Sequence, residues 1–415
     1  MRGNTRWVIC ALLFFATTVN YMDRQVLGIL KPLLEHDMHW SETDFGSMIS
    51  AFQLAYALMM PVAGRILDRL GVRTGYALAA LVWSLASMSH SLARTSFQFI
   101  LARFGLGLGE SGNFPAAIKT VAEWFPEKER ALATGILNSG SNVGAMVAPL
   151  LVPFVALRLG WRAVFLVTGS LDLVWIAAWL TYFSSPEKHH GITAEELTYI
   201  RSGQIDEPVH RIPYAQLLGT RQAWAFAAGK FMTDPAWWFY LFWIPSFLNR
   251  TYGLQLAQLG PPLIAIYLAA DAGSIMGGWL AAAFRSRGWS ANRARKAAML
   301  LCALCATPVI GLLWVTTLWP AVALISLAAA AHQGWSANLY TLVSDLFPKR
   351  AVGSVVGLGG LAGAASGTLA ASLTGRWLDF SHDKYGPLFV IAGSAYVVAF
   401  CMVQILTPHL KRASV

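Results

Sequence analysis

The chain has 415 residues, of which 56% are hydrophobic and only 13% are charged, and its mean hydropathy is +0.51. Soluble domains usually carry about 25% charged residues, so the composition excludes an ordinary soluble protein and predicts a polytopic membrane protein. The net charge of +10 could suit nucleic acid, but the basic residues follow a membrane topology, so we expect no nucleic-acid partner.

Twelve stretches are long and apolar enough to span a bilayer, which takes about 20 mostly apolar residues. If the N-terminus is cytoplasmic, Lys and Arg concentrate in cytoplasmic segments, most clearly in the basic cluster within 285–296. This bias predicts a multi-pass protein with both termini in the cytoplasm. The predicted spans are 7–30, 44–64, 75–93, 97–119, 131–156, 162–184, 221–248, 258–284, 295–314, 317–343, 351–376 and 386–407.

Two adjacent charges, Asp23 and Arg24, lie inside the first apolar stretch. Each costs about 2.5–3.5 kcal/mol at the bilayer centre, so such residues usually face a protein interior or a water-filled cavity. We interpret Arg24 as an anchor for an anionic substrate and Asp23 as a proton carrier. Adjacent side chains on a helix point about 100° apart, so the two need not pair, although mutual neutralisation is an alternative.

The loop after the second stretch reads GRILDRLGVR over residues 64–73. Its glycines permit unusual backbone dihedrals, which suits a tight cytoplasmic turn. An aspartate there can cap a neighbouring helix and pair with a basic residue when an inner gate is closed. An ordinary basic loop is the alternative. The predicted gating residues are Gly64, Asp68, Arg69, Gly71 and Arg73.

Glu110 lies in a glycine-rich part of the fourth stretch, where small residues let helix backbones approach closely. Close packing removes water from the carboxyl, so we predict that Glu110 loads and releases a proton, with a structural salt bridge as the alternative. In the fifth stretch, Asn138 and Asn142 lie one turn apart on one face and suit the recognition of hydroxyl groups.

A polar stretch separates six apolar stretches from six more, and we interpret 185–220 as a cytoplasmic linker between bundles 1–184 and 221–415. The halves repeat weakly, because Phe-Pro at 125–126 and at 347–348 each precedes an apolar stretch. Internal repeats are typical of secondary transporters, whose substrate site lies near the midplane between the repeats.

Polar side chains also interrupt the seventh apolar stretch. Lys230 and Asp234 have i,i+4 spacing and could pair, either at a substrate site or as a structural pair. Further along, Trp237, Trp238 and Tyr240 could flank a sugar ring or form an interface belt.

The tenth stretch carries a polar set of His332, Gln333, Trp335 and Asn338. His332 could relay protons or simply pack through a hydrogen bond. The roles of the acids Asp172 and Asp271 stay open.

Several segments resemble one transporter family. The loop at 64–73 resembles a signature of the major facilitator superfamily. NYMDR at 20–24, RFGLGLGESGNFPA at 103–116 and EWFPEKER at 123–130 together resemble its anion:cation symporter family. GKFMTDPAWWFY at 229–240 resembles bacterial hexuronate transporters. The resemblance covers nearly the whole chain and is weakest at the linker and near the C-terminus.

The resemblance implies an all-α integral membrane fold of twelve transmembrane helices in two pseudo-symmetric six-helix bundles, in a bacterial inner membrane. It also implies that Asp23 and Glu110 serve proton coupling, that Arg24 binds an anion and that Tyr56 contacts substrate. We therefore predict a secondary active transporter, not an enzyme, that imports a sugar-acid anion by proton symport with alternating access. We expect a hexuronate such as galacturonate or glucuronate. The candidate substrate-binding residues are Arg24, Tyr56, Asn138, Asn142, Lys230, Trp237, Tyr240, Gln333 and Asn338.

Three alternatives stay open. The substrate could be another organic anion, such as galactonate, glucarate or a dicarboxylate. A proton-driven drug exporter of the same superfamily would take cationic or lipophilic cargo, which Arg24 opposes. A transporter-like sensor would bind without translocating. We expect no metal and no cofactor. The proton is the expected coupling ion, although carboxylates could also bind sodium in that role. The expected partners are a small organic anion and the lipid bilayer, and we expect a monomer.

Overall fold

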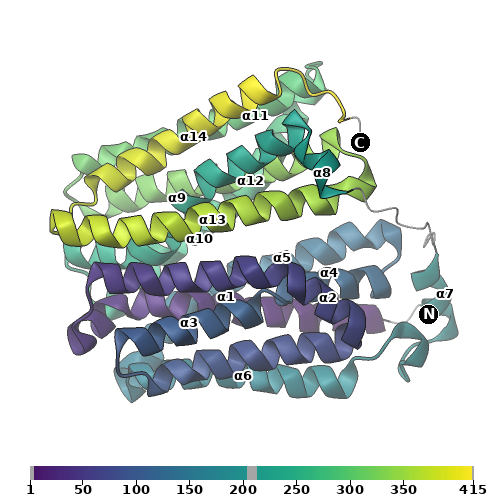
Figure 1. Cartoon of the computed structure of the whole chain (residues 1–415), viewed down its shortest axis with the longest axis horizontal. Coiled ribbons are helices and arrows are strands. Elements are labelled where there is room, and N and C mark those ends of the chain that lie inside the picture. Colours follow the sequence, from purple (N-terminus) through teal and green to yellow (C-terminus); the bar gives the residue numbers. More distant parts are fainter. Residues whose placement is uncertain (1–3, 203–212, 414–415) are drawn as a thin grey trace. The chain divides into compact units, whose positions relative to one another are not determined.

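The computed structural model describes residues 4–202 and 213–413, and these residues form helices joined by short turns (Figure 1). The elements in chain order are α1 (Thr5–Met38), α2 (Glu42–Ser89), η1 (His90–Leu92), α3 (Ser96–Glu110), α4 (Asn113–Trp124), α5 (Glu127–Leu159), α6 (Trp161–Tyr182), η2 (Pro186–Lys188), α7 (Ala194–Arg201), α8 (Tyr214–Leu218), α9 (Arg221–Tyr252), η3 (Leu256–Gln258), α10 (Gly260–Ser286), α11 (Ala291–Ala306), η4 (Thr307–Leu313), α12 (Leu318–Leu346), α13 (Lys349–Ser381) and α14 (Gly386–Leu406).

Each of the twelve predicted spans lies in helical structure. Gly71 breaks α2 with φ +76° and ψ 162°, so α2 supplies the second and third spans. The fourth span consists of α3 and α4, which are separated at Ser111 and Gly112. Within the described part of the chain, eight segments are apolar and long enough by themselves to cross a membrane. The span of α3 and α4 is not among them, nor are α9 and α12, which carry polar candidates such as Lys230 and His332.

The chain divides into two compact units. The first consists of the described residues of Met1–Trp40 and Ala51–Glu207, and the second of those of Ser41–Ser50 and Pro208–Val415. The predicted bundle and linker bounds stay predictions, and residues 203–212 of the linker lie outside the described residues.

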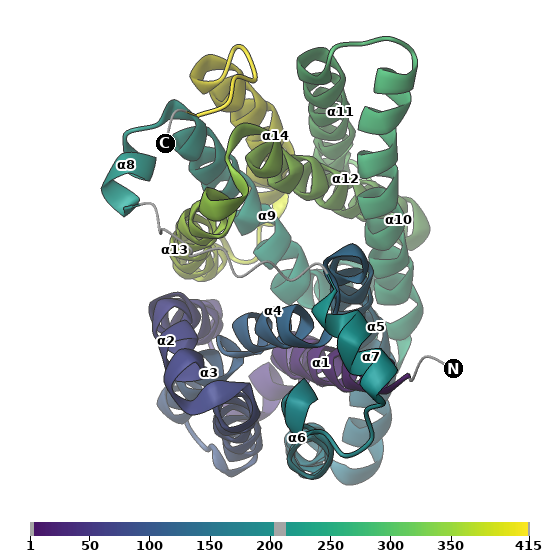
Figure 2. The same ribbon diagram turned by 90° about the vertical axis from the view of Figure 1, so that its right-hand side faces the viewer.

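In the first unit, α1 packs against α5 and α6, with α4 beside it (Figure 2). Glycines set the closest approaches. A Cβ atom added at Gly144 of α5 would lie 2.3 Å from the carbonyl oxygen of Thr18 on α1, and one at Gly107 of α3 would lie 2.3 Å from that of Phe52 on α2. Small residues therefore set the distance between these helices, as is usual in lipid.

In the second unit, α10 packs against α12, and α9 packs against α13 and α14. A Cβ atom at Gly273 of α10 would lie 2.1 Å from the carbonyl oxygen of Ala330 on α12. The first turn of α2 belongs to this unit, where Glu42 accepts hydrogen bonds from Trp243 Nε1 at 3.0 Å and pairs with Arg250 Nη2 at 3.0 Å.

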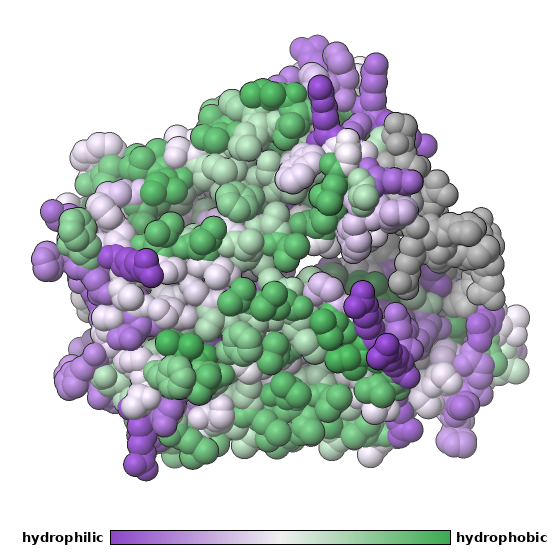
Figure 3. All heavy atoms as spheres, viewed as in Figure 1, coloured by the Kyte–Doolittle hydropathy of each residue, from purple (hydrophilic) through white to green (hydrophobic). Residues whose placement is uncertain are grey.

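Many large apolar side chains are exposed to the surroundings. On the face drawn in Figure 3, apolar residues cover much of the middle of the helices, whereas polar residues gather mainly near the helix ends. Leu58, Phe154 and Leu369 are examples of exposed apolar side chains. Lipid tolerates such side chains, and helices satisfy their own backbone hydrogen bonds there. The chain is therefore a multi-pass membrane protein.

Candidate functional site

Helix α1 places Arg24 inside the first unit, where it is only 4% exposed. Its Nε and Nη2 atoms donate to a single oxygen of Glu110, Oε2, at 3.0 and 2.7 Å. Glu110 is fully buried at the end of α3, and its Oε1 atom accepts no hydrogen bond from the residues that the structure describes. The predicted anion anchor and one predicted proton carrier are therefore direct ion-pair partners.

Three aromatic rings surround the guanidinium of Arg24. Its Cζ atom lies 4.7 Å from the ring centroid of Tyr21 and 5.2 Å from those of Phe52 and Tyr56. Ring faces attract a cation and replace part of the water that burial removes. The predicted substrate contact Tyr56 therefore lies beside Arg24. A guanidinium in this setting can exchange one carboxylate partner for another, because planar paired donors match any carboxylate.

Asp23 contacts different residues from those that Arg24 contacts. Ser87 of α2 donates from Oγ to Asp23 Oδ1 at 2.8 Å, and Thr168 and Asp172 of α6 face the same carboxyl. The adjacent charges of α1 therefore have separate partners, as the angle between neighbouring helix positions allows.

Arg103 is a second fully buried cation in this region, two turns before Glu110 on α3. Its Nη1 and Nη2 atoms donate to the backbone oxygen of Arg24 at 3.5 Å, and its charge faces Asp23 and Glu110. Arg103 was not among the predicted site residues, and the role of Asp172 was left open. A charge within an apolar helix was the available signal for both.

Amide side chains occupy two kinds of place in the first unit. The predicted Asn138 is exposed on α5 and Asn142 is half-buried. Their predicted role in recognising hydroxyl groups therefore still rests only on their spacing of one helical turn. Gln25 and Gln53 were not among the predicted site residues. Both are buried, and neither amide atom of either residue has a hydrogen-bond partner among the described residues. Such unsatisfied amides in an apolar helix are rare, and they mark places where a polar ligand or water would fit.

The predicted gating loop forms the expected tight turn at Gly71, where the positive φ angle favours glycine. Asp68 pairs with Lys119 of α4 at 2.9 Å, so its expected basic partner comes from the first unit itself. Arg73 donates to the backbone oxygen of Leu180. Arg69 is exposed, and a Cβ atom at Gly64 would meet no neighbouring atom.

In the second unit, Lys230 and Asp234 form the expected pair at 2.8 Å, and Lys230 Nζ lies 5.1 Å from the ring centroid of Tyr340. Trp237 stacks on His332 with centroids 4.9 Å apart, and His332 Nδ1 lies 2.7 Å from the hydroxyl of Tyr396. The half-buried Gln333 and the buried Tyr240, whose hydroxyl lacks a partner in the described part, lie in the neighbouring helices α12 and α9.

Asn338 of α12, a predicted substrate contact, already has protein partners for its amide. Its Nδ2 atom donates to the backbone oxygens of Gly277 and Gly334 at 2.8 and 2.9 Å, and its Oδ1 atom faces Arg295 Nη1 at 3.4 Å. The bond to Gly277 holds α12 against α10, and the bond to Gly334 lies within α12, so both amide donors are occupied.

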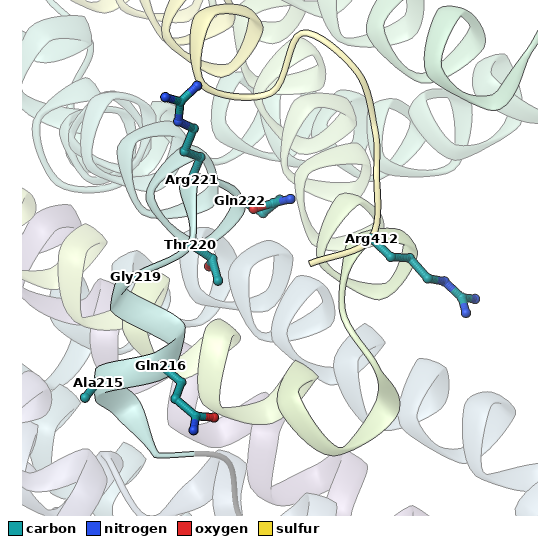
Figure 4. A pocket seen from close by; sticks show the side chains of 7 residues that line it. All are labelled: Ala215, Gln216, Gly219, Thr220, Arg221, Gln222 and Arg412. Carbon is teal, nitrogen blue, oxygen red and sulfur yellow. The ribbon is translucent and has the colours of Figure 1, made fainter. Parts of the chain in front are cut away.

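A surface hollow of about 540 Å³ in the second unit contains none of the predicted site residues. Figure 4 shows that the side chains of Arg221 and Arg412 point away from each other, so no charged groups converge there. Its lining residues are Ala215, Gln216, Gly219, Thr220, Arg221, Gln222 and Arg412.

Buried, paired charges in helices that span a membrane are typical of polytopic membrane transporters. The model of the Major Facilitator Superfamily matches residues 13–371, so the chain belongs to this superfamily and has its twelve-helix fold. The predicted resemblance is confirmed, and the protein is a transporter rather than an enzyme.

The chain is similar to named relatives over most of its length. It is 34% identical over 396 residues to the hexuronate transporter of Escherichia coli strain K12, covering 93% of this chain and 90% of that protein. It is 36% identical over 286 residues to the galacturonate transporter of Dickeya chrysanthemi, covering 68% and 82%. A crystal structure of a bacterial homologue of the human lysosomal transporter Spinster matches with a TM-score of 0.74 at 18% identity, covering 98% and 96%, and shares the fold.

Proposed function

We propose that this protein imports a sugar-acid anion, specifically a hexuronate such as glucuronate or galacturonate, by proton symport with alternating access. The observation that carries the proposal is the buried ion pair in which Arg24 donates to Glu110 at 2.7 Å. The substrates named for the relatives from E. coli and D. chrysanthemi support the choice of a hexuronate.

The ion pair supplies a reason for coupling. A hexuronate presents one carboxylate and several hydroxyl groups, and its carboxylate is chemically equivalent to that of Glu110. When Glu110 takes up a proton, it loses the charge that holds Arg24, and the substrate carboxylate can take its place. Proton binding and anion binding then favour each other, which is the thermodynamic requirement of a symporter.

The second unit carries side chains whose chemistry also suits a sugar acid. Trp237 presents a ring that can cover a sugar face, and Lys230 presents donors for hydroxyl or carboxylate oxygens. Lys230 already holds Asp234, so its contribution would again involve exchange of a partner. When one proton and one anion bind together, the net charge of the site does not change. This lowers the free-energy cost of the conformational change that exposes the site to the other side of the membrane.

The remaining parts of the proposal follow from topology and chemistry. The protein would lie in a bacterial inner membrane with both termini in the cytoplasm, because its basic residues concentrate in the segments assigned to that side. The proton would be the coupling ion, no cofactor would be needed, and a monomer would suffice. Sodium is the alternative coupling ion.

The test is uptake of radiolabelled glucuronate by proteoliposomes that contain the purified full-length protein. Proton and sodium gradients are imposed separately, and unlabelled galacturonate, galactonate and glucarate compete. We expect accumulation only with the proton gradient, collapse on addition of a protonophore, and strongest competition by galacturonate. Accumulation driven by sodium alone would show that sodium, and not the proton, is the coupling ion. No accumulation of any of these acids would contradict the proposal.

A further inference from the structure

A second buried carboxyl lies against Asp23. Asp172 of α6 is fully buried and Asp23 of α1 is 2% exposed, and their carboxyl groups face each other. Helix α6 packs directly on α1. The pair therefore lies at a helix contact of the first unit, one residue from the predicted anion anchor.

The hydrogen-bond inventory of this pair lacks donors. Ser87 Oγ serves Asp23 Oδ1, whereas Asp23 Oδ2 and both oxygens of Asp172 receive no hydrogen bond from the described residues. The indole of Trp83 faces Asp172, but its Nε1 atom makes no hydrogen bond to the described residues. An ionised carboxylate can only accept, so two of them in contact repel each other. A single proton turns one carboxyl into a donor and satisfies the contact.

The charges around the pair lead to the same conclusion. The described part of this cluster holds three carboxyl groups, on Asp23, Asp172 and Glu110, and two guanidinium groups, on Arg24 and Arg103. One bound proton makes this set neutral, and its loss leaves an uncompensated negative charge in a buried place, which is costly.

Two further titratable groups face this cluster. Tyr76 of α2 faces Asp172, and His90 of η1 faces Arg103. The hydroxyl of Tyr76 donates to Asn113, and Nδ1 of His90 lies 2.8 Å from the backbone oxygen of Ala86. The hydroxyl of Tyr76 is engaged, and the positive charge of Arg103 opposes a second proton on His90, whose Nε2 atom has no partner among the described residues. The carboxyl pair is therefore the natural place for the proton.

We propose that Asp23 and Asp172 hold one proton between them and exchange it with water during the transport cycle. The inference rests on the proton symport proposed above and adds Asp172 to it as a positioning residue that acts through Asp23. Release of the proton converts one carboxylic O–H into a second carboxylate. The resulting repulsion pushes α1 away from α6 and thereby displaces the neighbouring Arg24.

The pair itself is tested without substrate. Infrared difference spectra of the purified protein in lipid, recorded across a pH titration, follow the carbonyl band of protonated carboxyl groups. We expect Asp23→Asn and Asp172→Asn each to remove the same titrating band, and the double variant to remove no more, because a shared proton belongs to both residues. A band that survives Asp172→Asn unchanged would overturn the proposal.

Its role in coupling is tested in proteoliposomes. Asp172→Asn keeps the shape of the side chain and supplies a donor to Asp23, so folding is preserved. We expect proton-driven glucuronate accumulation to fall on the order of tenfold and to lose its pH dependence, while exchange between internal and external glucuronate stays within about threefold. Asp172→Glu, which keeps a titrating group, should restore part of the pH dependence.

The matched control is Asp271→Asn, which removes a half-buried acid of α10 in the second unit and should leave both assays unchanged. Equal loss of exchange and accumulation in Asp172→Asn would indicate a structural role and overturn the inference. If the wild-type protein shows no proton-driven accumulation, the proposed function fails. The infrared titration then still decides whether the pair shares a proton.

Discussion

At the scale of single residues, the central feature is that two neighbouring charges of α1 have different partners. Arg24 holds Glu110 of α3, whereas Asp23 contacts Ser87 of α2 and Asp172 of α6. The proposed anion-binding and proton-binding groups therefore lie on different sides of one helix. Substitutions of these residues should therefore impair transport in different ways.

Glu110→Gln separates coupling from binding. The amide keeps the size of the side chain but cannot ionise, so Arg24 is permanently open to a substrate carboxylate. We expect exchange of glucuronate across the vesicle membrane to persist and proton-driven accumulation to fall on the order of tenfold. Radiolabel exchange and gradient-driven uptake measured in the same vesicles check this result. Loss of exchange together with accumulation would show that Glu110 is needed for binding.

Arg24→Ala should abolish anion binding and also destabilise the protein. Removal of one partner from a buried ion pair costs about 3–5 kcal/mol when the other stays charged. Thermal unfolding in detergent should therefore begin at a lower temperature, and glucuronate should no longer raise the unfolding temperature. The double variant with Glu110→Gln should recover stability but not binding, since it removes the stranded carboxylate. Recovery of binding as well would exclude Arg24 as the anchor.

At the scale of helices, glycines fix where α1 lies. A Cβ atom at Gly144 of α5 would lie 2.3 Å from the carbonyl oxygen of Thr18 and 3.2 Å from Cβ of Tyr21, on the turns just before Asp23. The position of the predicted site therefore depends on the absence of a side chain on the neighbouring helix.

Gly144→Val should displace α1 and cost about 1–3 kcal/mol by overpacking. We expect lower thermal stability together with reduced glucuronate binding. Gly135→Ala on the same helix is the matched control, because a Cβ atom there meets nothing within 4 Å and alanine favours the helix. Equal effects of the two substitutions would contradict the packing argument.

The gating loop offers a test at the same scale. Asp68 and Lys119 form a pair whose side chains are 57% and 34% exposed, so its loss should change stability by less than about 1 kcal/mol. Asp68→Asn should nevertheless lower transport strongly if the pair acts in gating. Glu187→Gln, which removes another exposed ion pair with Arg201, should leave uptake unchanged. If Asp68→Asn takes up substrate as fast as the wild type, the proposed gating role of Asp68 is contradicted.

At the scale of the whole molecule, membership of the Major Facilitator Superfamily and the exposed apolar surface establish a multi-pass membrane transporter. An even number of spans puts both termini on one side of the membrane. The basic cluster within 285–296 favours the cytoplasmic side.

A fluorescent protein fused after Val415 should therefore fluoresce in cells, whereas alkaline phosphatase fused there should stay inactive. Active phosphatase at this position would place the C-terminus on the outer side and reverse the predicted orientation. A phosphatase fusion in the acidic first loop, after Asp37, is the control and should be active.

The sequence was sufficient for the properties that depend on neighbouring residues. Runs of apolar residues indicate where most spanning helices lie, because the bilayer favours apolar segments, and the predicted spans lie in helical structure. The break at Gly71 and the Lys230–Asp234 pair also follow from local spacing. Asp23, Arg24 and Glu110 stood out because a charge in an apolar helix is informative wherever its partner lies.

Only the tertiary structure decided which of these groups meet. Glu110 is 86 positions from Arg24, and Asp172 comes from a helix whose packing against α1 no local pattern reports. Asn338 was predicted to contact the sugar, yet its amide donates to the backbone oxygen of Gly277 on α10, which only packing brings to it, and to that of Gly334 one turn earlier on α12. Hydropathy is a property of a segment, whereas pairing depends on which helices are neighbours and at what depth their side chains lie. Hence the sequence predicted a transporter and its charged residues, and the structure showed how those charges are paired.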